Sequence, residues 1–277
     1  MTILNEAIAY RPELCAELLS RIRTRAPLIH HITNWVTITD CAQVTRCVGA
    51  LPVMAHMREE VAEMVQLASA LVLNIGTLSR QVVESMLVAG KAANARGIPV
   101  ILDIVGCGAT AVRTEAFEEL NRRLKLAVIK GNAGEVGAAA GVEAEVKGVE
   151  SVSVAGDIED VARHLARRSG AVVVVTGAVD TVTDGVRLHR CNAGHPLMGQ
   201  VVGTGCMFAS VLGAFAAVAN DPAEAAVCAL NFYGQAGALA AAAAATPLAF
   251  KIEFMDSLYR LAAAQTGALS GQTPEDR

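Results

Sequence analysis

Four short apolar runs alternate with helical patterns, and this alternation constrains the fold more than any other feature of the chain. Each run is an almost unbroken stretch of Val, Ile, Leu and Ala, which is typical of parallel strands buried on both faces. The sequence therefore predicts an α/β fold with a mostly parallel central sheet and helices on both faces. The strands are expected at residues 70–75, 98–103, 126–130 and 171–176, and the helices at 79–95, 113–124, 133–140 and 158–168.

The whole chain, residues 1–277, fits a single domain, because no repeat, linker or change of composition marks a boundary. Residues 181–189 predict an antiparallel hairpin that turns at Asp184-Gly185. The chain after this hairpin has a largely helical pattern. Residues 1–27 are expected to form an N-terminal helical segment, and residues 268–277 a disordered tail.

Composition and charge exclude several classes of protein. The net charge is −4, no basic run is present and only 4 % of residues are aromatic, so no nucleic-acid partner is expected. The seven cysteines are irregularly spaced and form no C-x-x-C pair, which predicts buried thiols in a reducing compartment. Residues 191–220 and 225–250 carry no charged side chain, and we interpret them as core helices rather than membrane spans. Without a signal-peptide pattern, a cytoplasmic protein with no membrane partner is predicted.

Polar residues follow the predicted strands, at the sheet edge where open parallel sheets bind ligands. Asp103 and Glu135 are carboxylates of the kind that hold Mg²⁺ through its waters and a substrate phosphate. The alternative is a helix N-cap for Asp103 and a first-turn acid for Glu135. Lys130 leaves a buried strand, so it requires an anion or an exit to solvent, and Thr176 either contacts a phosphate or ends its strand.

The stretch from Gly203 to Cys206 reads Gly-Thr-Gly-Cys and leads into a predicted buried helix at residues 207–218. Its glycines and the free N–H groups of the helix N-terminus are suited to an anion, and the same end favours a thiolate at Cys206. The alternative is that the glycines only permit close packing. Cys206 itself is a nucleophile, a general base or inert. His30, His31 and His56 lie near apolar segments, so a structural role is expected for them.

Several motifs together resemble the hydroxyethylthiazole kinases of the ribokinase-like superfamily, in order and in spacing. The similarity runs from about Leu28 to about Glu253, and Cys206 stands where most ribokinase relatives have aspartate. The motifs are His31-Ile-Thr-Asn34, Pro52-Val-Met54-Ala-His56, Asn74-Ile-Gly76-Thr77, Asp103-Ile-Val-Gly106-Cys-Gly108-Ala-Thr110, Lys130-Gly-Asn132-Ala-Gly-Glu135, Val175-Thr176-Gly177 and Gly203-Thr-Gly-Cys206.

The resemblance implies transfer of a phosphoryl group from ATP to 5-(2-hydroxyethyl)-4-methylthiazole, a salvage step of thiamine biosynthesis. It also implies a cytoplasmic homotrimer with sites between subunits. By position, Met54, Gly203 and Asn34 bind the thiazole, and Asn34 lies where a neighbouring subunit's pocket is completed. The remaining roles are ATP binding by Lys130, Thr176 and Asn132, an anion hole at Gly203, Thr204, Gly205 and Cys206, base catalysis by Cys206, and organisation of Mg²⁺ by Asp103 and Glu135.

Four residues depart from the usual family pattern and are expected to reshape the pocket: Ile104, Leu51, His31 and Trp35. Other readings therefore stay open. A related kinase would phosphorylate another small heteroaromatic alcohol, of the pyrimidine or pyridoxal type. A thiol hydrolase would use Cys206 without ATP, and a regulatory protein would bind ATP without turnover.

Overall fold

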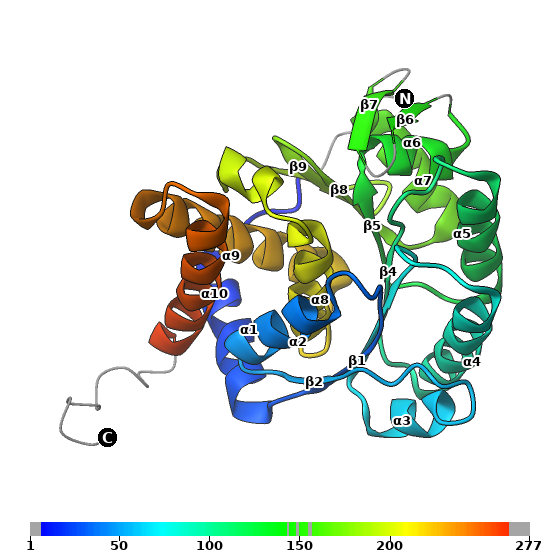
Figure 1. Cartoon of the computed structure of the whole chain (residues 1–277), viewed down its shortest axis with the longest axis horizontal. Coiled ribbons are helices and arrows are strands. Elements are labelled where there is room, and N and C mark those ends of the chain that lie inside the picture. The colour runs from blue at the N-terminus through cyan, green and yellow to red at the C-terminus, as the bar shows by residue number, and fades with distance from the viewer. Residues whose placement is uncertain (1–6, 143, 148–149, 155–156, 266–277) are drawn as a thin grey trace.

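A computed structural model describes residues 7–142, 144–147, 150–154 and 157–265 as an α/β fold built on one large sheet (Figure 1). The sheet has eight strands in the order β10-β9-β8-β5-β4-β3-β1-β2. Along this sheet, the neighbouring strands β8, β5, β4, β3, β1 and β2 pair in parallel. Strands β9 and β10 continue the sheet antiparallel. The bounds are β1 Leu28–Ile32, β2 Leu51–Val53, β3 Ala70–Asn74, β4 Val100–Asp103, β5 Val128–Asn132, β8 Val172–Thr176, β9 Asp180–Thr183 and β10 Leu188–Cys191.

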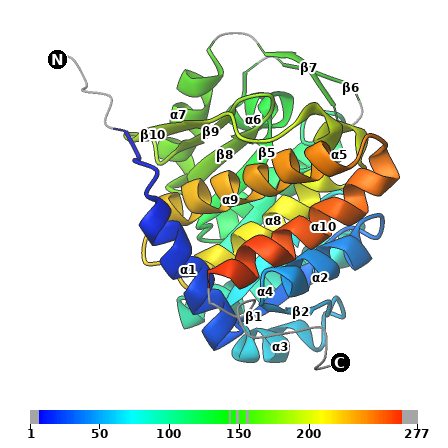
Figure 2. The same cartoon turned by 90° about the vertical axis from the view of Figure 1, so that its left-hand side faces the viewer.

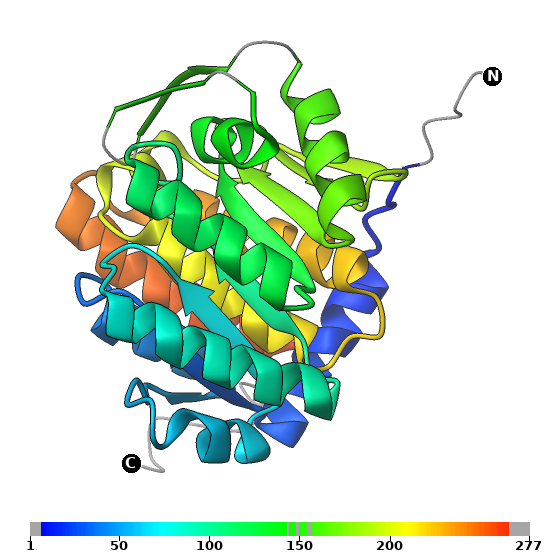
Figure 3. The same ribbon diagram turned by 90° about the vertical axis from the view of Figure 1, so that its right-hand side faces the viewer.

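Helices cover both faces of the sheet. One layer consists of α3 Val61–Leu67, α4 Arg80–Arg96, α5 Ala111–Arg123, α6 Ala133–Ala140 and α7 Ile158–Ser169 (Figure 3). The other consists of α1 Pro12–Arg25, α2 Ile38–Cys47, α8 Thr204–Ala216, α9 Pro222–Ala243 and α10 Pro247–Ala264 (Figure 2). A short 3₁₀ helix, η1 Pro196–Gln200, precedes α8, and β6 Ala144–Lys147 pairs with β7 Glu150–Val154 outside the large sheet.

Each face of the sheet carries its own apolar core, since successive side chains of a strand point to opposite faces. Val72 and Ile101 belong to the core under α8, whereas Leu71 and Leu102 belong to the core under α4 and α5. All four are fully buried. The strands therefore read as unbroken apolar runs, which is why their positions could be predicted from the sequence.

The predicted strands and helices between residues 70 and 176 are confirmed, with ends that differ by at most two residues. The hairpin at residues 181–189 is also confirmed as part of β9 and β10. Strands β1 and β2 were not predicted, because His30, His31 and Pro52 interrupt their apolar pattern. Helix α8 begins at Thr204, earlier than predicted, since Gly203 at φ +91° turns the chain directly into the helix. The predicted N-terminal segment contains α1, and the predicted tail at residues 268–277 lies outside the described residues.

Each of the two charge-free stretches contains a core helix, as predicted, α8 in the first and α9 in the second. Helix α9 is long and apolar enough to cross a membrane, but 67 % of its most apolar window is buried inside the fold. It packs between α8 and α10. All seven cysteines are free thiols, and Cys206 is the one among them that is not fully buried.

Two adjacent histidines of β1 are fully buried, and they make stability depend on pH. His31 Nδ1 lies 3.0 Å from the carbonyl oxygen of Ile29, and His30 Nε2 lies 2.8 Å from that of Ala55. Burial lowers the pKa of His31 to about 3 and also lowers the pKa of His30. Both rings are therefore neutral in the folded protein and take up a proton more readily when the chain unfolds.

Stability should consequently be full above the unfolded pKa of 6.5 and should fall as the pH drops from 6.5 toward 3. At pH 5, His31 alone should cost about 2 kcal/mol of the free energy of unfolding. Urea unfolding at pH 7.5 and pH 5 measures this loss. His31→Asn keeps a donor near Ile29 and should lose less between the two values, whereas His164→Gln, at an exposed histidine of α7, should behave as wild type. Equal losses in all three proteins would contradict the assignment.

Candidate active site

The polar ends of the parallel strands meet at the N-terminus of α8. Asn74, the last residue of β3, donates from Nδ2 to Asp103 Oδ2 at 2.7 Å and to Cys206 Sγ at 3.3 Å. Asn34, which follows β1, also donates to Cys206 Sγ at 3.3 Å and to Asn74 Oδ1 at 3.1 Å. The polar strand ends thus gather around Cys206, in the first turn of α8.

Lys130 forms a buried ion pair at the centre of this site. Its Nζ lies 3.0 Å from Asp103 Oδ1, and the two side chains are 5 % and 0 % exposed. Burial alone would lower the pKa of Lys130, but the carboxylates of Asp103 and Glu135 outweigh it and raise the pKa. Lys130 is therefore a fixed positive charge, and of its two predicted alternatives, an anion or an exit to solvent, the anion is the one realised.

This positive charge lies directly against the first turn of α8. A Cβ atom added to Gly205 would come within 2.9 Å of Lys130 Nζ. Gly203, the N-cap residue, supplies no side-chain acceptor to the helix. The first amide groups of α8 are consequently left for another acceptor, beside a fixed cation, which is the arrangement of an anion-binding helix N-terminus.

Gly203 is essential to this geometry for two reasons. Its φ of +91° disfavours any residue with a side chain, and an added Cβ would meet Thr37 Cγ2 at 2.3 Å. Thr37 in turn is held by Asn34 Oδ1, which accepts from its amide and its hydroxyl. Close packing, one of the two alternatives for these glycines, is thus present, and the anion site stays a prediction.

Gly203→Ala should therefore displace the turn and reduce kcat/KM by about a hundredfold or more, since a shift of about 1 Å at a reacting centre has that effect. Steady-state kinetics and a melting curve on one preparation measure it. Gly97→Ala is a matched control, because Gly97 also has a positive φ, +69°, but nothing lies within 4 Å of an added Cβ. Similar activity losses in the two variants would mean that contact with Thr37 is unimportant.

Cys206 carries a protonated thiol in this environment. Burial, and then the charge of Asp103, raise the pKa of Cys206 to about 11, while Lys130 opposes the shift. The direction is opposite to the lowered pKa that the helix N-terminus predicts. The prediction was wrong because the sequence could not show that Asp103 and the surrounding core would outweigh the helix end.

Glu135 is the N3 residue of a capping box at the start of α6. Its carboxylate accepts from the amides of Gly106 at 2.6 Å and Asn132 at 2.7 Å, and Asn132 Oδ1 accepts from the Glu135 amide. Burial raises the pKa of Glu135, against the effect of Lys130. The helix-capping alternative is thus realised, without excluding a second role for its remaining lone pairs.

Asp103 and Glu135 are the carboxylates predicted to organise a divalent cation. Each oxygen of Asp103 and Glu135 already accepts one hydrogen bond, and the described residues contain no group of three or more His, Cys, Asp or Glu side chains that could hold a metal ion. The two carboxylates do not fit a cation held by protein alone. A cation held through its own waters and substrate phosphates, the usual binding of Mg²⁺, stays a prediction for this pair.

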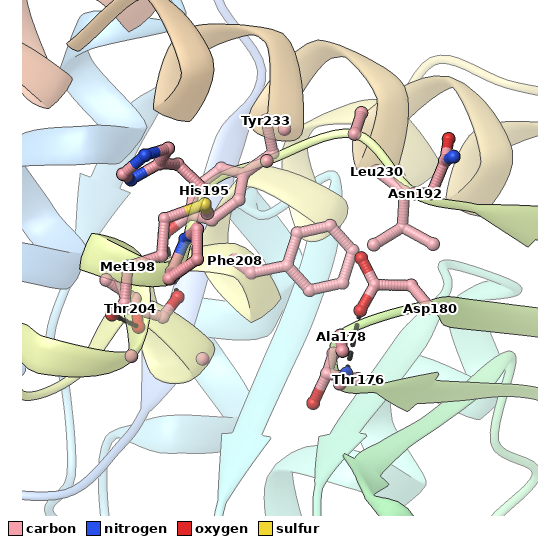
Figure 4. Close-up of a pocket in the computed structure, with 17 residues that line it drawn as sticks. Thr176, Ala178, Asp180, Asn192, His195, Met198, Thr204, Phe208, Leu230 and Tyr233 are labelled. Atoms are coloured by element: carbon pink, nitrogen blue, oxygen red, sulfur yellow. Dashed lines mark hydrogen bonds between the residues drawn. The ribbon is translucent and has the colours of Figure 1, made fainter. Parts of the chain in front are cut away.

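A cavity of about 600 Å³ opens on the other side of α8's first turn (Figure 4). It lies between the ends of β8 and β9, η1, and the helices α8 and α9. Thr176, Thr204 and Gly205 line it, together with Phe208 and Asp180. Asp180 Oδ1 accepts from the Gly177 amide at 2.8 Å, and burial raises the pKa of Asp180 to about 6. The strand end at Thr176-Gly177 was predicted to lie at the ligand-binding edge of the sheet. No feature of the sequence identified Asp180 as part of the cavity.

The sequence-predicted residues fall into three groups around the first turn of α8. The first turn of α8 brings together Lys130, Asp103, Asn34 and Cys206, and Gly205 lies against Lys130. Thr176 lies in the cavity, whereas Asn132 is the N-cap of α6 and does not line it. Met54 follows β2 on the opposite side, half-buried, and its carbonyl oxygen lies 3.1 Å from His56 Nδ1.

The four atypical residues have different surroundings. Leu51 begins β2 and lines a separate hollow of about 260 Å³ with Arg23, Arg46 and Tyr259, so its effect on the site stays a prediction. His31 and Ile104 are buried completely. Trp35 remains beside the site, with 57 % of its surface exposed.

Asn74 is the functional residue that sequence reasoning did not assign. Its amide joins Asp103 to Cys206, and its Oδ1 accepts from Asn34 and from the Gly76 amide at 2.8 Å. An asparagine as the last residue of a fully apolar strand was the available signal. Only the parallel register, which sets Asn74 opposite Asp103, shows what it contacts.

Comparison with known proteins identifies the family. The model of the hydroxyethylthiazole kinase family matches residues 19–264. The chain belongs to the hydroxyethylthiazole kinase family. A hydroxyethylthiazole kinase of Methanocella arvoryzae is 53 % identical over 89 % of this chain and 92 % of its own. One of Methanoculleus marisnigri is 54 % identical over 88 % of this chain and 87 % of its own.

Solved structures agree with this membership. The hydroxyethylthiazole kinase protein of Pyrococcus horikoshii has a TM-score of 0.81 at 40 % identity, covering 90 % of this chain and 93 % of its own. A ribokinase-like superfamily protein of Enterococcus faecalis has a TM-score of 0.61 at 13 % identity, over 89 % of this chain and 94 % of its own, and shows the fold alone. The fold class and the family resemblance predicted from the motifs are both confirmed. Hydroxyethylthiazole kinases are phosphotransferases, so this family member is an enzyme of that class.

Proposed function

We propose that this protein transfers the γ-phosphoryl group of ATP to the hydroxyl of 5-(2-hydroxyethyl)-4-methylthiazole, as a salvage step toward thiamine diphosphate. The observation that carries the proposal is Lys130, a buried cation fixed against the uncapped first turn of α8, with Cys206 in the same turn. This turn separates the cavity near Thr176 from the side where Met54 and Asn34 lie. ATP would enter from the cavity and the alcohol from the opposite side, which suits an in-line transfer.

In this mechanism the amides of Thr204, Gly205 and Cys206 hold the transferring group, as donors of an oxyanion hole do. Lys130 balances its charge, and Thr176 contacts the nucleotide. The thiolate form of Cys206, which Asn34 and Asn74 hold in place, accepts the proton of the alcohol and becomes the thiol. Asp103 and Glu135 would hold Mg²⁺ through its waters, and the ion would neutralise phosphate charge.

The surroundings of Cys206 favour this proposal over a thiol hydrolase. Cys206 Sγ hydrogen-bonds to the amides of Asn34 and Asn74 and to the Asp103 carboxylate, and no histidine ring is among its partners in the part of the chain that the structure describes. A Cys-dependent hydrolase needs a base such as imidazole at that position.

We also propose a cytoplasmic homotrimer, which would cover the exposed side chains of Val36 and Val202 next to the site.

The test is an assay of ADP release with thiazole, pyrimidine and pyridoxal alcohols, with and without a chelator of divalent cations. We expect the thiazole alcohol to give the highest kcat/KM and the chelator to abolish turnover. Higher kcat/KM for a pyrimidine or pyridoxal alcohol would move the protein to a related kinase activity. Nucleotide binding without turnover on any alcohol would indicate a regulatory protein.

A further inference from the structure

Trp35 follows Asn34 in a turn that hydrogen bonds hold in place. Asn34 Oδ1 accepts from the amides of Val36 and Thr37 at 3.0 Å each, while Asn34 Nδ2 donates to Cys206 Sγ. The Trp35 amide donates to Thr77 Oγ1 at 3.1 Å. The backbone of Trp35 is therefore fixed from both sides, one residue away from a group that contacts the proposed catalytic thiol.

The indole ring is held as well. Its centroid lies 4.6 Å from that of the His56 ring, at an interplanar angle of 32°. The two ring nitrogens of His56 lie 3.1 Å from the Met54 carbonyl oxygen and 3.1 Å from the Thr33 amide nitrogen. The aromatic pair thus bridges the residues that follow β1 to those that follow β2, where Met54 is expected to bind the acceptor.

One side of the indole is covered by His56, yet 57 % of Trp35 remains exposed. A large aromatic side chain kept rigid and exposed at the rim of a site is suited to a ligand that stacks on it. We propose that Trp35 is a specificity residue for the alcohol, whose flat heteroaromatic ring stacks on the free side of the indole. This inference rests on the proposed kinase function and names the ring recognition within it.

Trp35 is the single tryptophan of the chain, so its emission reports on this site alone. Titrating the thiazole alcohol into the full-length protein without nucleotide should give a saturable change in tryptophan fluorescence. Titrating ATP alone should change it little, because the cavity near Thr176 lies on the other side of α8's first turn. The same titration with a non-aromatic primary alcohol should also have little effect.

Substitution provides the second readout. Trp35→Leu should raise the KM for the thiazole alcohol by about 2- to 13-fold, the equivalent of one aromatic pair, and leave the KM for ATP and kcat nearly unchanged. Trp35→Phe should restore most of the affinity. Tyr259→Leu is a matched control at an exposed aromatic residue of α10, remote from the site, and should match wild type.

The outcomes separate this inference from the proposed function. Turnover of the thiazole alcohol with no fluorescence response and an unchanged KM in Trp35→Leu would overturn the role of Trp35 alone. Emission that depends only on protein concentration would also overturn it and would assign the ring to a contact between copies. A saturable response to the alcohol with no turnover would refute the kinase function but support stacking.

Discussion

Cys206→Ala should lower kcat by about 10²–10⁴-fold while Cys206→Asp keeps substantial activity. Aspartate supplies a carboxylate base that can accept from the same amides of Asn34 and Asn74. The fold should tolerate both changes, because Asn34 also donates to Asn74 and Asn74 also donates to Asp103. Cys47→Ala, at a buried thiol of α2, is the control for the loss of a cysteine.

The pH profile distinguishes a base from a merely structural thiol. Because the pKa of Cys206 is about 11 in this environment, only a small fraction is thiolate at neutral pH, and that fraction grows tenfold per pH unit. The kcat/KM for the alcohol should therefore rise with pH through the alkaline range in wild type. It should be flat there in Cys206→Asp, whose base is already ionised. Parallel profiles in the two proteins would rule out Cys206 as the base.

The sequence was sufficient for the fold because the buried parallel strands carry their signal locally. Val172–Thr176 is apolar at four successive positions, and only a strand covered on both faces uses such a run. Strand β1 could not be predicted from an apolar run, since His30 and His31 are polar by type and yet fully buried. Their neutral state depends on carbonyl partners and on burial, which follow from tertiary packing.

The candidate site was predictable in its members and less so in its electrostatics. Lys130 could be assigned an anion because a lysine leaving a buried strand has few alternatives. That the anion is Asp103, and that Asp103 raises the pKa of Cys206, follows from the register of β4 against β5 and the approach of α8. The role of Glu135 could not be chosen from the sequence alone, because its carboxylate satisfies the capping pattern and also lies near Lys130.

The buried ion pair between Lys130 and Asp103 should produce the largest stability effect in the protein. Lys130→Met leaves a carboxylate that is 0 % exposed without its cation, and Asp103→Asn leaves the ammonium without its anion. Breaking such a pair by removing one partner typically costs about 3–5 kcal/mol. Both single variants should show this loss in urea unfolding, and both should lose turnover because the charge beside Gly205 is absent or misplaced.

The double variant separates stability from chemistry. Lys130→Met with Asp103→Asn removes both charges, and the new amide can still accept from Asn74, so most of the lost stability should return. Turnover should not return, because no cation faces the first turn of α8. Replacing both partners of the exposed pair of α5 by neutral residues, Arg123→Met with Glu119→Gln, should change the free energy of unfolding by less than about 1 kcal/mol. Additive losses in the buried double variant would show that Lys130 and Asp103 act independently. A double variant that regained both stability and turnover would show that Lys130 supports the fold alone, with no part in holding the phosphoryl group.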